Sequence, residues 1–215
     1  LPLIAIATSV DVLAVVAAQI SSVPLLGWMT VGLSVCALFG AWFWWSCTDD
    51  SMGPGYFLLA QYGLIGMTVL HAGEWSVVGV VSQGIALLLG GPVIFLWGGH
   101  QENRRALLVG PLLAALMVVG LPLTVGYIGM WALYTGLDWD GAWITIGIVA
   151  LLIHTLLVAG SIRWALRPRE LFSGEEGLSG RMHLLGLGIP IAVGVYLGLM
   201  PDTLFDFIGA ETIPA

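Results

Sequence analysis

Four side chains able to take up or release a proton lie in or beside long apolar stretches of this 215-residue chain: Asp11, His71, Glu74 and His154. Ionisable groups inside a membrane span are rare, and they mark paths for protons or ions. These four residues are therefore the candidates for a proton path. Their spacing does not resemble that of a nucleophile, a base and an orienting group, so we predict no catalytic residue in the chain.

His154 is the most isolated of the four, because it lies in the apolar run IVALLIHTLLVAG. The simplest interpretation is a neutral imidazole that bonds to Thr155, Thr145 or a backbone carbonyl. A proton relay is a second possibility, and an axial ligand of a chlorophyll or haem is a third. A haem held by two histidines would need a partner, but the other histidines are nearer predicted helix ends. A pigment with one ligand needs no such partner.

A second unusual segment is GLPLTVGYIGMWALY, residues 120–134, which contains a proline, a threonine and several glycines within an apolar run. Proline removes a backbone donor, and glycine tolerates unusual dihedrals, so the segment predicts a helix break. Freed backbone groups at membrane depth must be covered by other helices or by water, and transporters use such breaks to line ion paths. A packed proline kink is the alternative. The residues of the predicted break are Gly120, Pro122, Thr124, Gly126, Gly129 and Met130.

The composition is that of a membrane protein with several spans, because 59% of the residues are hydrophobic, 9% are charged and the mean hydropathy is +1.00. No lysine is present, which excludes a retinal Schiff base. A net charge of −7 argues against nucleic acid as a partner. No motif typical of a metal site or of nucleotide binding occurs, so we predict neither.

The apolar runs predict an all-α membrane helix bundle that forms a single domain over residues 1–215. We expect about seven transmembrane helices, at roughly 3–20, 25–46, 55–72, 76–97, 106–135, 142–165 and 183–200. The fifth run is too long for one straight span, so we expect it to be interrupted over Gly120–Gly129. With this topology all the arginines lie on one side, and we predict that these loops are cytoplasmic.

The break has the pattern G-x-P-x-T-x-G-[FY]-I-G-x-[FW], and it resembles the interrupted helix of the antiporter-like subunits of respiratory complex I and of Mrp-type cation/proton antiporters. A second segment, residues 47–67, looks like the T-D-x-K-R-x-x-x-Y-S-x-x-[HQ]-x-G segment of the same family. The residues in register there are Thr48, Asp49, Tyr56, Gln61 and Gly63. The resemblance covers nearly the whole chain, which corresponds to the C-terminal half of such a subunit.

The chain departs from the family at the ionisable positions. Met130 stands where proton-carrying members have a lysine or glutamate, and Ser51 and Met52 replace the Lys-Arg pair of the second segment. Alignment with the helix that carries histidine and lysine in many members puts apolar residues there instead: Val81, Ile85 and Leu89. Only Asp11 lies about where the family has a lysine or histidine.

The resemblance and these losses together predict a non-catalytic accessory subunit of a larger energy-converting membrane complex, derived from a proton-translocating ancestor and no longer pumping. Its partners would be other membrane subunits and the lipids of an energy-transducing membrane, either a plasma membrane or an inner membrane. One alternative is an active half-channel that uses Asp11, His71, Glu74 and His154. Another is a pigment- or haem-binding subunit with His154 as ligand. We predict no cofactor of this chain itself, although helix grooves could hold lipid, quinone or pigment.

Overall fold

The computed structural model describes residues 23–49, 52–97, 106–137, 144–166 and 178–208, and these residues form helices and turns without any strand. The all-α class is therefore confirmed for the described part of the chain. The predicted first span at 3–20, with Asp11, lies outside it. The helices are α2 (Val23–Ser46), α3 (Gly53–Val69), the 3-10 turn η1 (Gly73–Trp75), α4 (Ser76–Trp97), α5 (Ala106–Val119), α6 (Val125–Thr135), α7 (Ile144–Ala165), α8 (Leu178–Leu199) and α9 (Pro201–Ile208).

Three of these helices are long and apolar enough to cross a membrane: Leu26–Ser46 in α2, Ser76–Ile94 in α4, and α7. The other predicted spans within the described residues are also helical, since α3, α5 with α6, and α8 overlap them. The short helix α9 was not predicted. The protein is thus a helical one whose apolar helices are compatible with a membrane, while a count of seven crossings stays a prediction.

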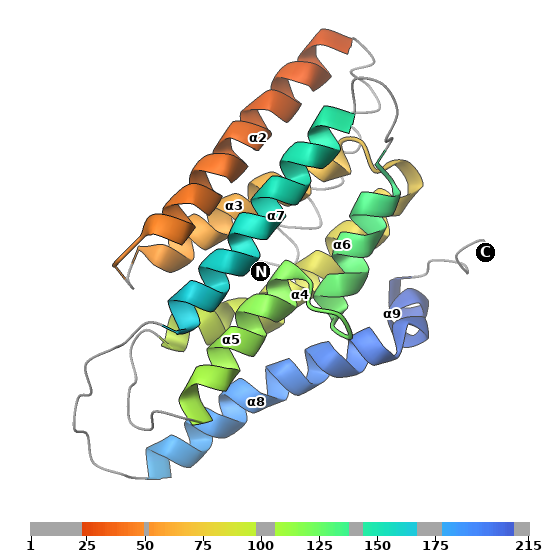
Figure 1. Ribbon diagram of the computed structural model, residues 1–215. Helices are drawn as coiled ribbons and strands as arrows, with labels where there is room; N and C mark the ends of the chain where they lie inside the picture. Colours follow the sequence, from red (N-terminus) through yellow and green to blue (C-terminus); the bar gives the residue numbers. More distant parts are fainter. Residues whose placement is uncertain (1–22, 50–51, 98–105, 138–143, 167–177, 209–215) are drawn as a thin grey trace.

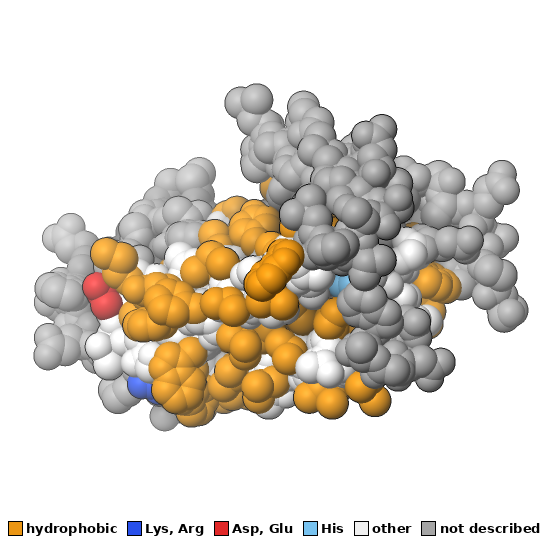
Figure 2. Space-filling view, turned by 90° about the horizontal axis from the view of Figure 1, so that it is seen from above, with side chains coloured by type: hydrophobic (Ala, Val, Ile, Leu, Met, Phe, Trp, Pro, Cys, Tyr) orange, Lys and Arg blue, Asp and Glu red, His pale blue; other side chains and the backbone are white. Residues whose placement is uncertain are grey.

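The surface of the longest helices is apolar. On α2 the exposed large side chains recur every three or four residues, which places them along one face of the helix: Trp28, Val31, Val35, Phe39 and Trp42. On α7 a similar face carries Ile144, Ile148, Leu151, Leu152 and Ile162. Figure 2 shows hydrophobic side chains over most of the described surface on one side of the molecule. Apolar stripes of this length are what lipid-facing helices present.

The helices pack as a bundle in which α2 lies against α3 and α7, and α5 lies against α4 and α7 (Figure 1). Helix α4 also lies along α6, and α8 packs against α4, α5 and α6. Small residues allow these close approaches. A Cβ on Gly40 of α2 would lie 2.6 Å from the backbone nitrogen of Ala60 on α3. Close packing of this kind is the main source of helix association in membranes.

The predicted fifth run, 106–135, is confirmed as two helices separated by a break, but the break is shorter than predicted. Helix α5 ends at Val119, and α6 begins at Val125. The interruption therefore covers Gly120–Thr124, and the prediction that it continues to Gly129 was wrong. The physical reason is a helix cap: the Thr124 hydroxyl accepts a hydrogen bond from the Tyr127 backbone N–H at 3.4 Å, so the helix restarts there.

Candidate functional site

The break turns the chain by placing two residues in the left-handed region. Gly120 has a φ of 106° and Leu123 has a φ of 71°. Glycine adopts such a conformation readily, whereas a leucine there costs about 1–3 kcal/mol and must be held by its surroundings. The Thr124 hydroxyl provides part of that hold, because it donates to the Leu121 carbonyl at 2.6 Å.

Pro122 leaves one carbonyl of α5 without its helical donor. In a continuous helix the N–H of residue 122 would donate to the Val118 carbonyl, but proline has no N–H. The side-chain amide of Gln61 on α3 replaces it, with Nε2 donating to the Val118 oxygen at 3.1 Å. Both residues are fully buried. The glutamine therefore supplies the donor that the proline removes.

A second glutamine completes this contact. Gln83 on α4 is also fully buried, and its Oε1 accepts from Gln61 Nε2 at 3.0 Å. Its own Nε2 donates to the Gly126 carbonyl in the first turn of α6 at 2.8 Å. We call Gln61 and Gln83 the amide bridge, since together they join α3 and α4 to the carbonyls on both sides of the break. No ionisable side chain takes part in this bridge.

The amide bridge keeps one unused acceptor. Gln61 Oε1 is buried and has no hydrogen-bond partner among the described residues, and the same holds for Ser82 Oγ on α4. An unpaired buried acceptor favours the approach of a donor, because leaving it unmatched costs about 1–3 kcal/mol. The hydrogen-bonding groups that remain unpaired in this region are therefore an amide oxygen and a hydroxyl.

Glycines bring the neighbouring helices directly onto the break. A Cβ on Gly126 would overlap the Met117 carbonyl of α5, and one on Gly129 would lie 2.8 Å from Gln83 Cγ. On α8 a Cβ at Gly198 would overlap the backbone of Thr124. The break is thus covered by protein on the side of α5, α4 and α8, whereas Pro122 and Leu123 are exposed. Gly126 and Gly129, predicted as part of the break, serve this packing.

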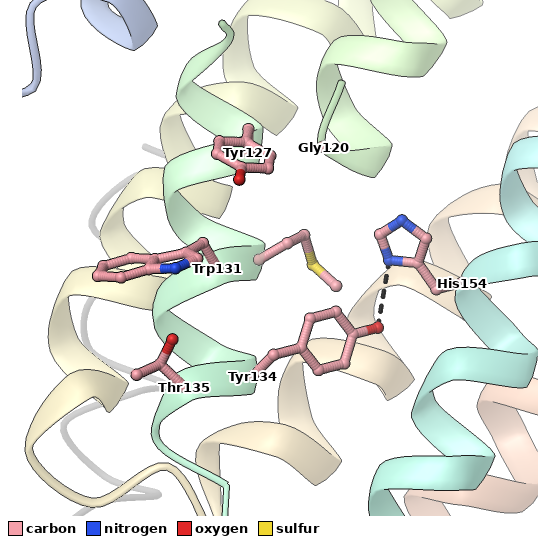
Figure 3. A pocket seen from close by; sticks show the side chains of 7 residues that line it. Gly120, Tyr127, Trp131, Tyr134, Thr135 and His154 are labelled. Atoms are coloured by element: carbon pink, nitrogen blue, oxygen red, sulfur yellow. Dashed lines mark hydrogen bonds between the residues drawn. The ribbon is translucent and has the colours of Figure 1, made fainter. Parts of the chain in front are cut away.

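The other side of α6 is not filled. Met130 is 2% exposed and packs on the break, since a Cβ on Gly120 would lie 3.0 Å from Met130 Cγ. Beside it is a cavity of about 410 Å³, which we call the groove (Figure 3). Its lining residues come from the break, from α6 and from α7: Gly120, Tyr127, Met130, Trp131, Tyr134, Thr135 and His154.

His154 reaches the groove from α7 and is held by Tyr134. The Tyr134 hydroxyl lies 3.2 Å from His154 Nδ1 and 3.3 Å from the Ala150 carbonyl one turn back on α7. Figure 3 shows the tyrosine pointing from α6 toward the imidazole. The interpretation of a hydrogen-bonded imidazole is thus right in kind, but the partner is Tyr134. The Thr155 hydroxyl instead donates to the Leu151 carbonyl at 2.8 Å.

Of the remaining proton-path candidates, His71 alone has a described side chain. His71 follows α3, and its Nε2 lies 2.9 Å from the Thr30 hydroxyl of α2. Partial burial lowers the pKa of His71 below its usual value. Glu74 belongs to η1, and its side chain lies outside the described residues, as does Asp11. The groove lining includes His154 but not His71, so these two histidines belong to different sites.

No group of three or more metal-ligating side chains occurs in the described ranges. No model of a known protein family matches the chain. No curated protein matches it either. The resemblance to antiporter-like subunits therefore rests on the two motifs alone.

Two residues of the site, Gln83 and Tyr134, were missed by sequence reasoning, and Gln61 was noted only as a motif position. A signal for the amide bridge was present, because glutamines in otherwise apolar helices need partners. Counting back one turn from Pro122 would have identified Val118 as the carbonyl that lacks a donor. Tyr134 gave no comparable signal, since only the packing of α6 against α7 brings it to His154.

Proposed function

We propose that this chain is a non-pumping accessory subunit of a larger energy-converting membrane complex, built on the half of an antiporter-like subunit that contains the interrupted helix. The observation that carries the proposal is the amide bridge. Gln61 and Gln83 bond one carbonyl on each side of the break, and Met130 occupies the position of the family's ionisable residue. Amides and a thioether do not exchange protons near neutral pH, so neither the amide bridge nor Met130 can carry a proton.

The structural role follows from the same contacts. The break is held by α3, α4 and α8, and its glycines allow these helices to approach closely. The apolar stripes of α2 and α7 are available to lipid or to neighbouring membrane subunits. The proposal includes seven spans with the arginine-bearing loops on the cytoplasmic side.

Proton flux tests the loss of pumping. The purified chain is reconstituted in liposomes with an imposed pH gradient, and the flux is followed with an internal pH dye. We expect the flux of protein-free liposomes. A higher flux that is abolished by Asp11→Asn or His154→Leu would overturn the proposal in favour of a working half-channel.

Co-purification tests the accessory role. Mass spectrometry after extraction in mild detergent should recover this chain with other multi-span membrane subunits and a redox-active or antiporter partner. Recovery of the chain alone, under conditions that keep other membrane complexes of the same cells intact, would contradict it.

Two native cysteines test the orientation. Cys47 directly follows α2 on the side that we assign to the cytoplasm, whereas Cys36 lies on the exposed face of α2 within the apolar stretch. A membrane-impermeant maleimide should label Cys47 in inside-out vesicles and not in intact cells. Cys36 should stay unlabelled from both sides, because it lies within the apolar stretch. The Cys47→Ser variant is the control, and it should therefore show no labelling in either preparation. Labelling of Cys47 from outside would reverse the assigned orientation.

A further inference from the structure

His154 has one ring nitrogen left for a ligand. Among the described residues, the Tyr134 hydroxyl contacts the Ala150 carbonyl and His154 Nδ1, and it has one proton to donate. Both contacts are hydrogen bonds at once only if the tyrosine donates to the carbonyl and Nδ1–H donates to the tyrosine oxygen. Nε2 then carries a lone pair, and it has no partner among the described residues. A histidine whose Nδ1–H is held by a partner in this way presents Nε2 as an oriented acceptor.

The groove around this acceptor is shaped for a flat apolar ring. Its volume of about 410 Å³ falls in the range of small-molecule sites. Two aromatic walls are partly open to the outside, since Tyr127 is 43% exposed and Trp131 is 42% exposed. Trp131 is held from the other side by Trp75, with ring centroids 5.3 Å apart at 79°. Figure 3 shows the free edge of the imidazole turned away from Tyr134.

We infer that the groove binds a lipid-soluble phenol or quinol, whose ring lies between the aromatic side chains and whose hydroxyl donates a hydrogen bond to His154 Nε2. A donor is required because Nε2 offers only a lone pair, and a ring matches the walls of Tyr127 and Trp131. An apolar tail would leave through the open side toward the membrane. This binding goes beyond the accessory role and does not depend on it.

The test compares two probes that differ only in the hydroxyl, 4-nonylphenol and nonylbenzene, added to the purified chain in lipid nanodiscs. Thermal unfolding reports binding, because a ligand of the folded state raises the melting temperature. The ¹⁵N resonance of His154 Nε2 in histidine-labelled protein reports the hydrogen bond itself. The variants are His154→Leu and Tyr134→Phe, with Thr155→Val as the control, since Thr155 is exposed on the neighbouring face of α7.

We expect the phenol to bind the wild-type chain about five- to tenfold more tightly than nonylbenzene, as one neutral hydrogen bond provides. The Nε2 resonance should shift with the phenol only. The preference should vanish in His154→Leu, weaken in Tyr134→Phe and persist in Thr155→Val.

Equal binding of the two probes to the wild-type chain would overturn the inference, and this comparison requires no variant to fold. A phenol preference that survives in His154→Leu would also overturn it. So would a pigment that co-purifies with a visible absorption band and is lost in His154→Leu, because Nε2 would then be a metal ligand. None of these results bears on proton flux, so the inference and the accessory role fail separately.

Discussion

The two sides of α6 differ in how they are packed at the helix break. Toward α3 and α4, the amide bridge donates to the buried carbonyls of Val118 and Gly126 at 2.8–3.1 Å, and Gly129 lies directly against Gln83. Toward α7, a cavity of about 410 Å³ remains, and His154 presents an unused acceptor. On the first side the polar groups are paired and the helices are closely packed. On the second side a cavity with a hydrogen-bond acceptor remains, and it could bind a ligand. A break that resembles part of an ion path can thus be closed on one face and still form a site on the other.

The largest effect is expected at Gly126, where α6 meets α5. In Gly126→Ala the new methyl group would overlap the Met117 carbonyl, and a backbone atom cannot move aside as a flexible side chain can. We expect a loss of about 3 kcal/mol in the free energy of unfolding, together with loss of the groove. Chemical denaturation in detergent micelles would measure it.

Gly32→Ala on α2 is the matched control. Gly32 is exposed and no atom lies within 4 Å of its Cβ position, so helix propensity alone should act. A gain of up to about 1 kcal/mol is expected there. Equal stabilities for the two variants would show that α5 and α6 are not in close contact at the break.

The amide bridge should give the next largest effect. Gln61→Leu leaves the Val118 carbonyl buried without a donor, because Pro122 cannot replace it, and we expect a loss of about 2 kcal/mol. Gln83→Leu should cost less, about 1 kcal/mol, because the Gly126 carbonyl lies in the first turn of α6 and keeps its helical hydrogen bond.

A double-mutant cycle sharpens this prediction. Since Gln61 and Gln83 share a hydrogen bond of 3.0 Å, the double variant should lose less than the two single losses combined. Simple additivity would mean that the two amides act independently, and the bridge would not be a unit.

Hydropathy was sufficient to predict the long helices of the described residues but not α9, because a long apolar run has few alternatives in a membrane. The stretch 106–135 was predicted correctly at both ends. The end of the break was missed, since the Thr124 cap competes locally with the flexibility of Gly126 and Gly129, and the cap prevails. The site was harder still. Gln83 and Tyr134 become functional only through contacts with residues far away in the sequence, and such pairings are set by packing.

Tyr134→Phe tests the open side of α6 with a smaller expected effect. The substitution keeps the ring and removes the hydroxyl that bonds to His154 and to the Ala150 carbonyl. Because Ala150 keeps its helical hydrogen bond, the loss should be about 1 kcal/mol in the free energy of unfolding. The ¹⁵N spectrum should also show a mixture of imidazole tautomers. An unchanged single tautomer would mean that something other than Tyr134 orients His154.

His71 provides the last comparison, because it makes the same kind of contact as His154 but does not line the groove. The Thr30 hydroxyl donates to the Leu26 carbonyl at 2.9 Å, so it accepts a hydrogen bond from His71 Nε2–H.

Burial lowers the pKa of His71 in the folded chain below 6.5, the value of the unfolded chain. The folded state then binds fewer protons than the unfolded state between these two pKa values. The contribution of His71 to stability is therefore complete above the unfolded pKa and is lost as the pH falls through the folded one. The free energy of unfolding, measured from neutral to acidic pH, should lose this pH dependence in His71→Gln. The change in the free energy should be smaller than the loss expected for Tyr134→Phe. If His71→Gln leaves the pH profile unchanged, burial does not lower the pKa of His71 in the folded chain, and the prediction is wrong.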